Sequence, residues 1–158
     1  MAGLDAKDLR ILARLMEDAS ISNRDLARAL GLAESSTLER VRRLRRDGVI
    51  RGQHADIDLG ALGARLEVLI LIRLTNNARE SVEHLRDHLL KQPEVRSVFL
   101  VSGEFDFLVH AAVRDSDHVR RLELDRVTSR PEVDGVRTLL IFEHAANFSL
   151  PVEGPEDV

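Results

Sequence analysis

Apolar residues recur every third or fourth position through the first 50 residues, which predicts helices that each bury one face. Asp5 precedes the first helix as an N-cap, and Ser22 precedes the second. The second and third helices meet at Gly31, because glycine accepts the left-handed backbone that commonly ends a helix. The positions expected to form one small core are Leu9, Ile11, Leu12, Leu15, Met16, Leu26, Ala27, Leu30, Leu38, Val41 and Leu44.

The third predicted helix carries five arginines in the seven residues from Arg40 to Arg46. Two short helices joined at a glycine, the second of them basic, are typical of a helix-turn-helix that enters the major groove of DNA. The side opposite the apolar stripe is polar, with Arg40 and Arg42 on its flanks. The residues predicted to contact base edges are Ser35, Ser36, Glu39, Arg40 and Arg43, and those predicted to contact phosphates are Arg42, Arg46 and Arg51.

The arginine run has a second interpretation as a solvated helix face, with Glu39 paired to Arg43 four residues later. Five arginines on a helix-turn-helix spacing favour DNA binding instead. Arg45 lies nearer the apolar stripe, so we expect its stem to extend along the core.

The distribution of charge separates a basic head from an acidic body. Residues 1–52 have a net charge of +3 and residues 53–158 a net charge of −7, within a total of −4. There is no cysteine, which excludes disulfide and thiolate chemistry. The polar start MAGLDAKD is unlike a signal peptide, and the uncharged apolar run 68–72 is too short to span a bilayer, so we expect a soluble cytoplasmic chain.

The expected domains are a helix-turn-helix head at 1–52, a glycine-containing hinge at 53–64, a body at 65–148 and a disordered tail at 149–158. A short strand-like connection is expected over 49–57. In the body the pattern predicts strands at 65–74, 95–102, 105–113 and 136–144, helices at 78–90 and about 115–129, and a tight turn at Gly103-Glu104. We therefore predict an α+β chain with a winged-helix-like head and a ferredoxin-like βαββαβ body.

Several body strands are apolar on both faces. In the first strand, Val68 and Ile70 alternate with Leu69 and Leu71. Helices on one side of the sheet would leave an apolar face uncovered. We expect a second subunit to cover it, because the hinge segment is too short to cover four strands.

Five sequence blocks, taken in this order, give the chain a specific resemblance to a known family. They are LDAKDLRIL at 4–12, DLARALGL at 25–32, TLERVRRLRRDGVIRG at 37–52, and VSGEFDFL at 101–108 followed by DGVRTLLIF at 134–142. The chain resembles the Lrp/AsnC, or feast/famine, transcriptional regulators from Leu4 to about Phe148. The resemblance implies a DNA-binding head and a RAM/ACT-like body that forms dimers, commonly assembled into octamers, and binds an amino acid between subunits.

The resemblance also implies an effector site at Ser102, Gly103, Glu104 and Asp106, with Thr138 and Leu139 contributed by the neighbouring subunit. Backbone N–H groups at Gly103 and Glu104 suit an α-carboxylate, and the Asp106 carboxylate suits an α-ammonium. The alternative is a plain hairpin turn with a polar residue beside it.

Two residues depart from the family pattern. Ala33 stands where a serine usually caps the recognition helix, which costs about 1 kcal/mol unless Ser35 or Ser36 replaces that cap. Glu39 stands where a polar or basic residue is common, so the operator sequence cannot be taken from relatives.

Three other functions compete with that of an effector-responsive regulator. An enzyme lacks support, because His84 and His88 have a metal-binding spacing but no third ligand and no nucleophile is evident. We therefore expect no metal, no cofactor and no catalysis. An architectural DNA-binding protein without an effector, and a metabolite-binding protein whose head no longer binds DNA, remain as alternatives.

Overall fold

The computed structural model describes residues 3–76 and 78–147, which fall into two compact units. The head runs up to Asp56 and takes in the described residues 145–147, and the body is Ile57–His144. The division lies inside the segment 53–64 that the sequence marks as a hinge. The predicted tail 149–158 lies outside the described residues.

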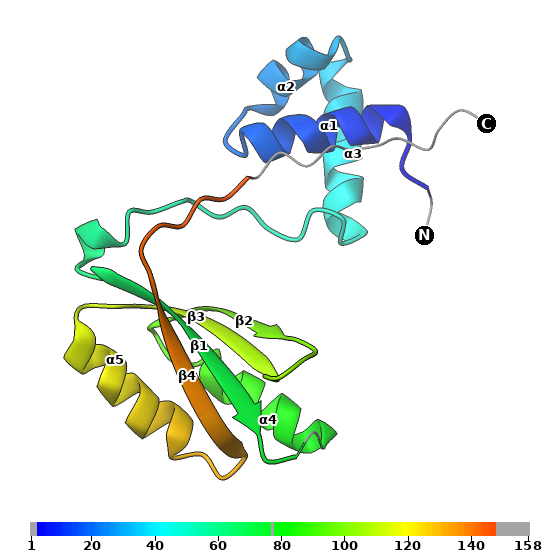
Figure 1. The fold of residues 1–158 in the computed structure, drawn as a ribbon. Helices are drawn as coiled ribbons and strands as arrows, with labels where there is room; N and C mark the ends of the chain where they lie inside the picture. Colours follow the sequence, from blue (N-terminus) through cyan, green and yellow to red (C-terminus); the bar gives the residue numbers. More distant parts are fainter. Residues whose placement is uncertain (1–2, 77, 148–158) are drawn as a thin grey trace. The chain divides into compact units, whose positions relative to one another are not determined.

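The head consists of α1 (Ala6–Glu17), α2 (Asn23–Leu30) and α3 (Glu34–Arg46), as predicted (Figure 1). The Asp5 and Ser22 side chains cap α1 and α2 by accepting backbone N–H groups three residues later. Gly31 ends α2 in the left-handed region at φ 66°. The buried residues at the centre of the head's core are Ile11, Leu26, Val41 and Leu44.

The start of α3 has no side-chain cap. Ala33 occupies the N-cap position, and neither Ser35 nor Ser36 replaces the missing hydrogen bond. Thr37 is fully buried and donates its hydroxyl back to the Ala33 carbonyl. The first N–H groups of α3 are therefore open to solvent or to a bound anion.

We expect Ala33→Ser to stabilise the head by about 1 kcal/mol, because Ala33 already has the extended backbone of an N-cap and a serine hydroxyl would accept an orphan N–H. Thermal unfolding of the full chain should show a higher unfolding temperature for Ala33→Ser. The control is Ala29→Ser on the exposed side of α2, which should be neutral or slightly destabilising. Equal effects of the two substitutions would contradict the missing cap.

The predicted strand-like connection after α3 is wrong, since residues 49–57 form no strand. The backbone N–H groups of Val49 and Ile50 both turn back to the Leu44 carbonyl, at 2.9 and 3.1 Å, and Gly48 is left-handed at φ 74°. These hydrogen bonds satisfy a backbone carbonyl at the end of α3. The N–H groups of Val49 and Ile50 are therefore not available for strand pairing.

The body is a four-stranded antiparallel sheet in the order β2-β3-β1-β4 with two helices, which confirms the predicted ferredoxin-like arrangement (Figure 1). The elements are β1 (Leu66–Leu74), α4 (Arg79–Leu89), β2 (Val95–Leu100), β3 (Phe107–Val113), α5 (Ser116–Leu122) and β4 (Val133–Ile141). A short 3-10 turn, Gly60–Leu62, precedes β1, and a π-helical stretch, Glu123–Thr128, continues α5.

Several boundaries in the body differ from the prediction, among them the end of β4, which lies at Ile141 rather than at residue 144. β4 begins at Val133 rather than at residue 136, because Val133 pairs with Leu74 across an irregularity in the ladder. The predicted tight turn at Gly103-Glu104 is a wider loop, residues 101–106, because β2 ends at Leu100 and β3 begins at Phe107. A bond from the Val101 N–H to the Asp106 carbonyl, 2.9 Å long, closes this loop.

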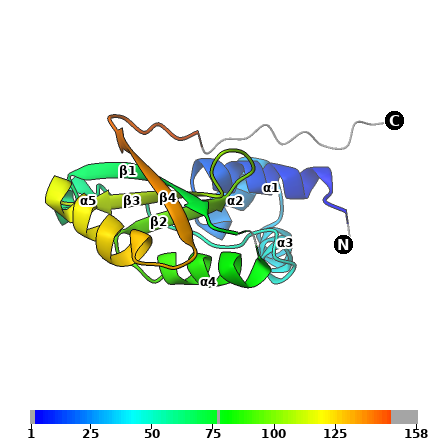
Figure 2. The ribbon, with the colours of Figure 1, turned by 60° about the horizontal axis from the view of Figure 1, so that its bottom comes forward.

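The two faces of the sheet have different surroundings. Residues such as Ile70 and Val109 face α4 and α5 and are fully buried with Leu85 and Leu122. Figure 2 shows α4 along one side of the strands. The opposite face carries Leu69, Leu71, Leu108, Phe99 and Leu139. Phe99 and Leu139 remain 51% and 47% exposed, so the apolar side chains of this open face are uncovered in the single chain, although Arg137 and the His110–Glu67 pair lie on the same face.

Among the described residues, no helix is both long enough and apolar enough to cross a bilayer.

Candidate nucleic-acid interface and effector loop

The exposed side of α3 carries most of the residues predicted to contact DNA. Ser35, Ser36, Glu39, Arg42 and Arg46 are all exposed. A surface cavity on this side is lined by Ser36, Glu39, Arg40, Arg42, Arg43 and Arg46. The helix therefore offers hydroxyl, carboxylate and guanidinium groups on one concave surface, which suits base edges and phosphates.

Arg40 and Arg43 are not free on this surface, because both contact α1. Arg40 Nη1 lies 2.7 Å from Asp5 Oδ2 and 2.8 Å from Asp8 Oδ1. Arg43 Nη2 donates to Asp8 Oδ2. Arg43 thus pairs with Asp8, not with Glu39 as the solvated-face interpretation supposed. Asp8 is fully buried, and the sequence analysis missed it.

The pKa of Asp5 is lowered by the Asp8 backbone N–H that it caps and by the Arg40 guanidinium, and the pKa of Arg40 is raised by the same carboxylates. Both shifts favour the charged forms. The Asp5–Arg40 pair between α1 and α3 is therefore ionised at neutral pH.

The remaining arginines of α3 differ in their freedom. Arg42 forms no ion pair with any residue that the structure describes. Arg46 is 3.2 Å from Asp47 and its side chain is 76% exposed. Arg45 is also exposed, and its guanidinium donates to the Gln53 side chain at 3.1 Å, so it already has a hydrogen-bond partner outside the predicted interface. Arg42 and Arg46 are consequently the most accessible cations for phosphates.

The loop 101–106 presents exposed backbone between β2 and β3. Ser102, Gly103 and Glu104 are exposed, and Gly103 has φ 134°, a conformation that strains other residues. Arg137 of β4 faces this loop: its guanidinium lies 5.3 Å from the centre of the Phe105 ring, and Nη2 lies 3.7 Å from Glu104 Oε1. Arg137 is a loop neighbour that the sequence analysis missed.

Asp106 anchors the loop to the end of β1. Its backbone N–H donates to the Ile72 carbonyl at 2.9 Å, and its Oδ2 accepts the Leu74 N–H at 2.7 Å. The other oxygen, Oδ1, accepts no hydrogen bond within the described part of the chain. Asp106 is the predicted partner of the effector's ammonium group, and one of its carboxylate oxygens therefore already has a structural role.

Thr138 and Leu139 lie on opposite faces of the sheet. Thr138 pairs with Ile70 on the helix side and donates its hydroxyl to the Glu123 carboxylate. Leu139 pairs with Leu69 on the open face, the side on which Arg137 meets the loop. Leu139 therefore shares a face of the sheet with Arg137, and Thr138 lies on the other face.

Comparison with known proteins identifies the two units separately. Residues 67–148 match the Lrp/AsnC ligand binding domain, and residues 4–51 match a winged helix-turn-helix DNA-binding domain. The chain belongs to the Lrp/AsnC family. The predicted resemblance is confirmed, and the Lrp/AsnC chain is a transcriptional regulator with a DNA-binding head and a ligand-binding body.

Its relatives cover nearly the whole Lrp/AsnC chain. The transcriptional regulator AldR of Mycolicibacterium smegmatis is 40% identical over 141 residues, which are 89% of this chain and 82% of AldR. The leucine-responsive regulatory protein of Escherichia coli is 36% identical over 140 residues, 89% of this chain and 85% of that protein.

Solved structures agree with this Lrp/AsnC fold. A transcriptional regulator from Neisseria meningitidis in complex with L-methionine superposes with a TM-score of 0.86, at 26% identity and over 95% of this chain and 97% of that one. The structure named MtbAldR has a TM-score of 0.77 at 33% identity, over 91% of this chain and 98% of that one.

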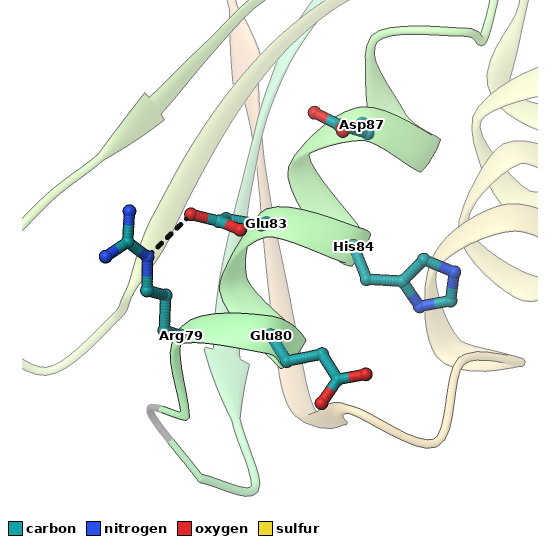
Figure 3. A pocket seen from close by; sticks show the side chains of 5 residues that line it. All are labelled: Arg79, Glu80, Glu83, His84 and Asp87. Carbon is teal, nitrogen blue, oxygen red and sulfur yellow. Dashed lines mark hydrogen bonds and ion pairs between the residues drawn. The ribbon is translucent and has the colours of Figure 1, made fainter.

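A second surface cavity of the Lrp/AsnC body lies on α4 and is lined by Arg79, Glu80, Glu83, His84 and Asp87 (Figure 3). Arg79 pairs with Glu83 at 2.8 Å, on the other side of the helix from His84. The two histidines with metal-binding spacing have separate partners, since His84 Nδ1 contacts Glu132 and His88 Nε2 contacts a backbone carbonyl. No group of three potential metal ligands occurs among the described residues.

Proposed function

We propose that this Lrp/AsnC regulator reads a specific operator through the exposed side of α3 and changes its DNA affinity when a small amino acid binds the body. The accessible pair Arg42 and Arg46, beside Ser35, Ser36 and Glu39, carries the DNA part of the proposal. In this assignment the serines and Glu39 contact base edges, and the two arginines contact phosphates. Such a protein acts on DNA in the cytoplasm and has no catalytic step and no resident cofactor.

The loop 101–106 is the proposed effector site. Exposed N–H groups at Gly103 and Glu104 would receive the α-carboxylate, and Asp106 Oδ1 would receive the α-ammonium. We assign Leu139 to the pocket wall and Thr138 to the support of β4. The complex of the Neisseria meningitidis relative with L-methionine supports an amino acid as the effector class.

We propose a homodimer through the open face of the sheet as the smallest functional unit. A second copy would cover the exposed Phe99 and Leu139 and would supply a second head for a two-fold operator. The family resemblance further suggests that such dimers assemble into octamers. Light scattering should give twice or eight times the chain mass, and a monomer would contradict the proposal.

An architectural DNA-binding protein without an effector is a second candidate. One observation favours it: the Asp106 carboxylate already accepts the Leu74 N–H, so the loop has a structural reason for its sequence.

Selection from a random duplex pool, with and without the twenty amino acids, tests the proposal. We expect enrichment of one related set of sequences, and release or tighter binding with one class of amino acid. Retention of all sequences alike, with no amino acid effect, would favour the architectural function instead.

A further inference from the structure

The buried carboxylate of Asp8 joins α1 to the basic helix α3. Asp8 is 0% exposed, and both of its oxygens are occupied. Oδ1 accepts Arg40 Nη1 at 2.8 Å, and Oδ2 accepts Arg43 Nη2 together with the Asp5 backbone N–H at 3.1 Å. Asp5 adds a second carboxylate to Arg40 at 2.7 Å. Two acids of α1 therefore balance two of the five arginines of α3.

The two arginines keep donors for other partners while they are held. Arg40 uses only Nη1 and Arg43 uses only Nη2 in these contacts, and both side chains line the cavity on the exposed side of α3. Their side chains are 23% and 34% exposed. A guanidinium held in this way has a fixed direction and a compensated charge, whereas Arg42 is exposed and has no ion-pair partner among the described residues.

A buried ion pair is weak evidence of stability, because desolvating the charges offsets much of their attraction. Replacing such a pair with well-packed apolar residues of similar volume is often neutral or stabilising. The charged contact is better explained by what it does to the arginines.

We infer that Asp8 is a positioning residue for operator recognition. It fixes Arg40 and Arg43 as oriented donors beside the groove-facing residues of α3. It also compensates their positive charge, so that the two arginines contribute less to phosphate binding. This inference rests on the proposed use of α3 in DNA binding. It separates two classes of arginine: Arg40 and Arg43 serve specificity, and Arg42 and Arg46 serve general affinity.

Asp8→Asn tests the inference, because asparagine is nearly isosteric and retains an acceptor for one arginine or for the Asp5 N–H. Affinities of the full chain are measured for a selected operator and for a scrambled duplex over a range of salt concentrations. We expect the ratio of operator to scrambled affinity to fall by about tenfold or more, while scrambled DNA binds as tightly or more tightly, with a salt slope steeper by about one.

Asp25→Asn is the matched control, since it removes the same charge from the head and frees Arg28, its exposed partner at 2.9 Å. It should leave the affinity ratio within about twofold. A purely structural role of Asp8 would instead weaken binding to both duplexes together, without a steeper slope. An unchanged ratio in folded Asp8→Asn protein would overturn the inference.

If Asp8→Asn fails to fold, Asp5→Asn tests the positioning of Arg40, because it weakens one of the two carboxylates that hold this arginine. Asparagine is an equally good N-cap, and the Asp5 side chain is 51% exposed, so α1 should be retained. The ratio of operator to scrambled affinity should fall and the salt slope should become steeper, both by less than in Asp8→Asn. An unaltered affinity ratio and an unaltered salt slope would overturn the inference. Wild-type protein that does not distinguish the two duplexes would refute the proposed function itself, before any variant is compared.

Discussion

Replacing both Arg42 and Arg46 with alanine should lower DNA affinity by about tenfold or more and reduce the salt slope by about two, because each removes one phosphate contact and its released counterion. The loss should be similar for operator and scrambled DNA, since phosphate contacts carry no direct sequence information. Both side chains are exposed outside the core of the head, so the thermal unfolding temperature should change little.

The matched control is a double substitution of Arg79 and Arg86, two exposed arginines on α4 of the body. It removes the same net charge and should leave the DNA affinity nearly unchanged at physiological salt. Equal losses from the two double variants would show that total charge, and not the surface of α3, determines binding.

Asp106→Asn should abolish the response of DNA binding to amino acids and leave DNA affinity without effector as it is. The asparagine carbonyl oxygen can still accept the Leu74 N–H, so the loop keeps its anchor at the end of β1. The negative charge opposite the effector's ammonium group is lost, and a hydrogen bond to a charged partner is worth about 1.5–3 kcal/mol. Effector affinity should therefore fall by about tenfold to a hundredfold, as measured by calorimetry.

Asp117→Asn in the first turn of α5 is the control, because it changes the charge of the body at an exposed position away from the loop. It should retain the full response. If Asp106→Asn also retained the response to amino acids, the Asp106 carboxylate would have only its structural role. That result would favour an architectural DNA-binding protein without an effector.

The helices of the head could be predicted because local rules determine them. Capping by Asp5 and Ser22 and the left-handed Gly31 require only residues near in sequence. The start of β4 could not be predicted in the same way, because Val133 joins the sheet through its pairing with Leu74. The loop 101–106 is wider than a hairpin turn for a similar reason, since Asp106 pairs with the end of β1.

The candidate sites show the same division between local and distant information. Helical periodicity placed Ser35, Ser36 and Glu39 on one exposed side, but it could not show that Asp8, on another helix, pairs with Arg40. A carboxylate three residues after an N-cap is a recognisable capping box, and in this chain the same acid reaches α3. Alternation along β4 was sufficient to place Thr138 and Leu139 on different faces, once the strand was known.

The most direct test of the account is a fluorescence anisotropy titration of the full chain against DNA from upstream of its own gene, at two salt concentrations, with and without a panel of amino acids. The account predicts binding that exceeds binding to a scrambled duplex, weakens with salt and shifts with one class of amino acid. Equal binding to both duplexes without any amino acid effect would contradict it, and no binding to either duplex would refute the DNA-binding assignment of α3.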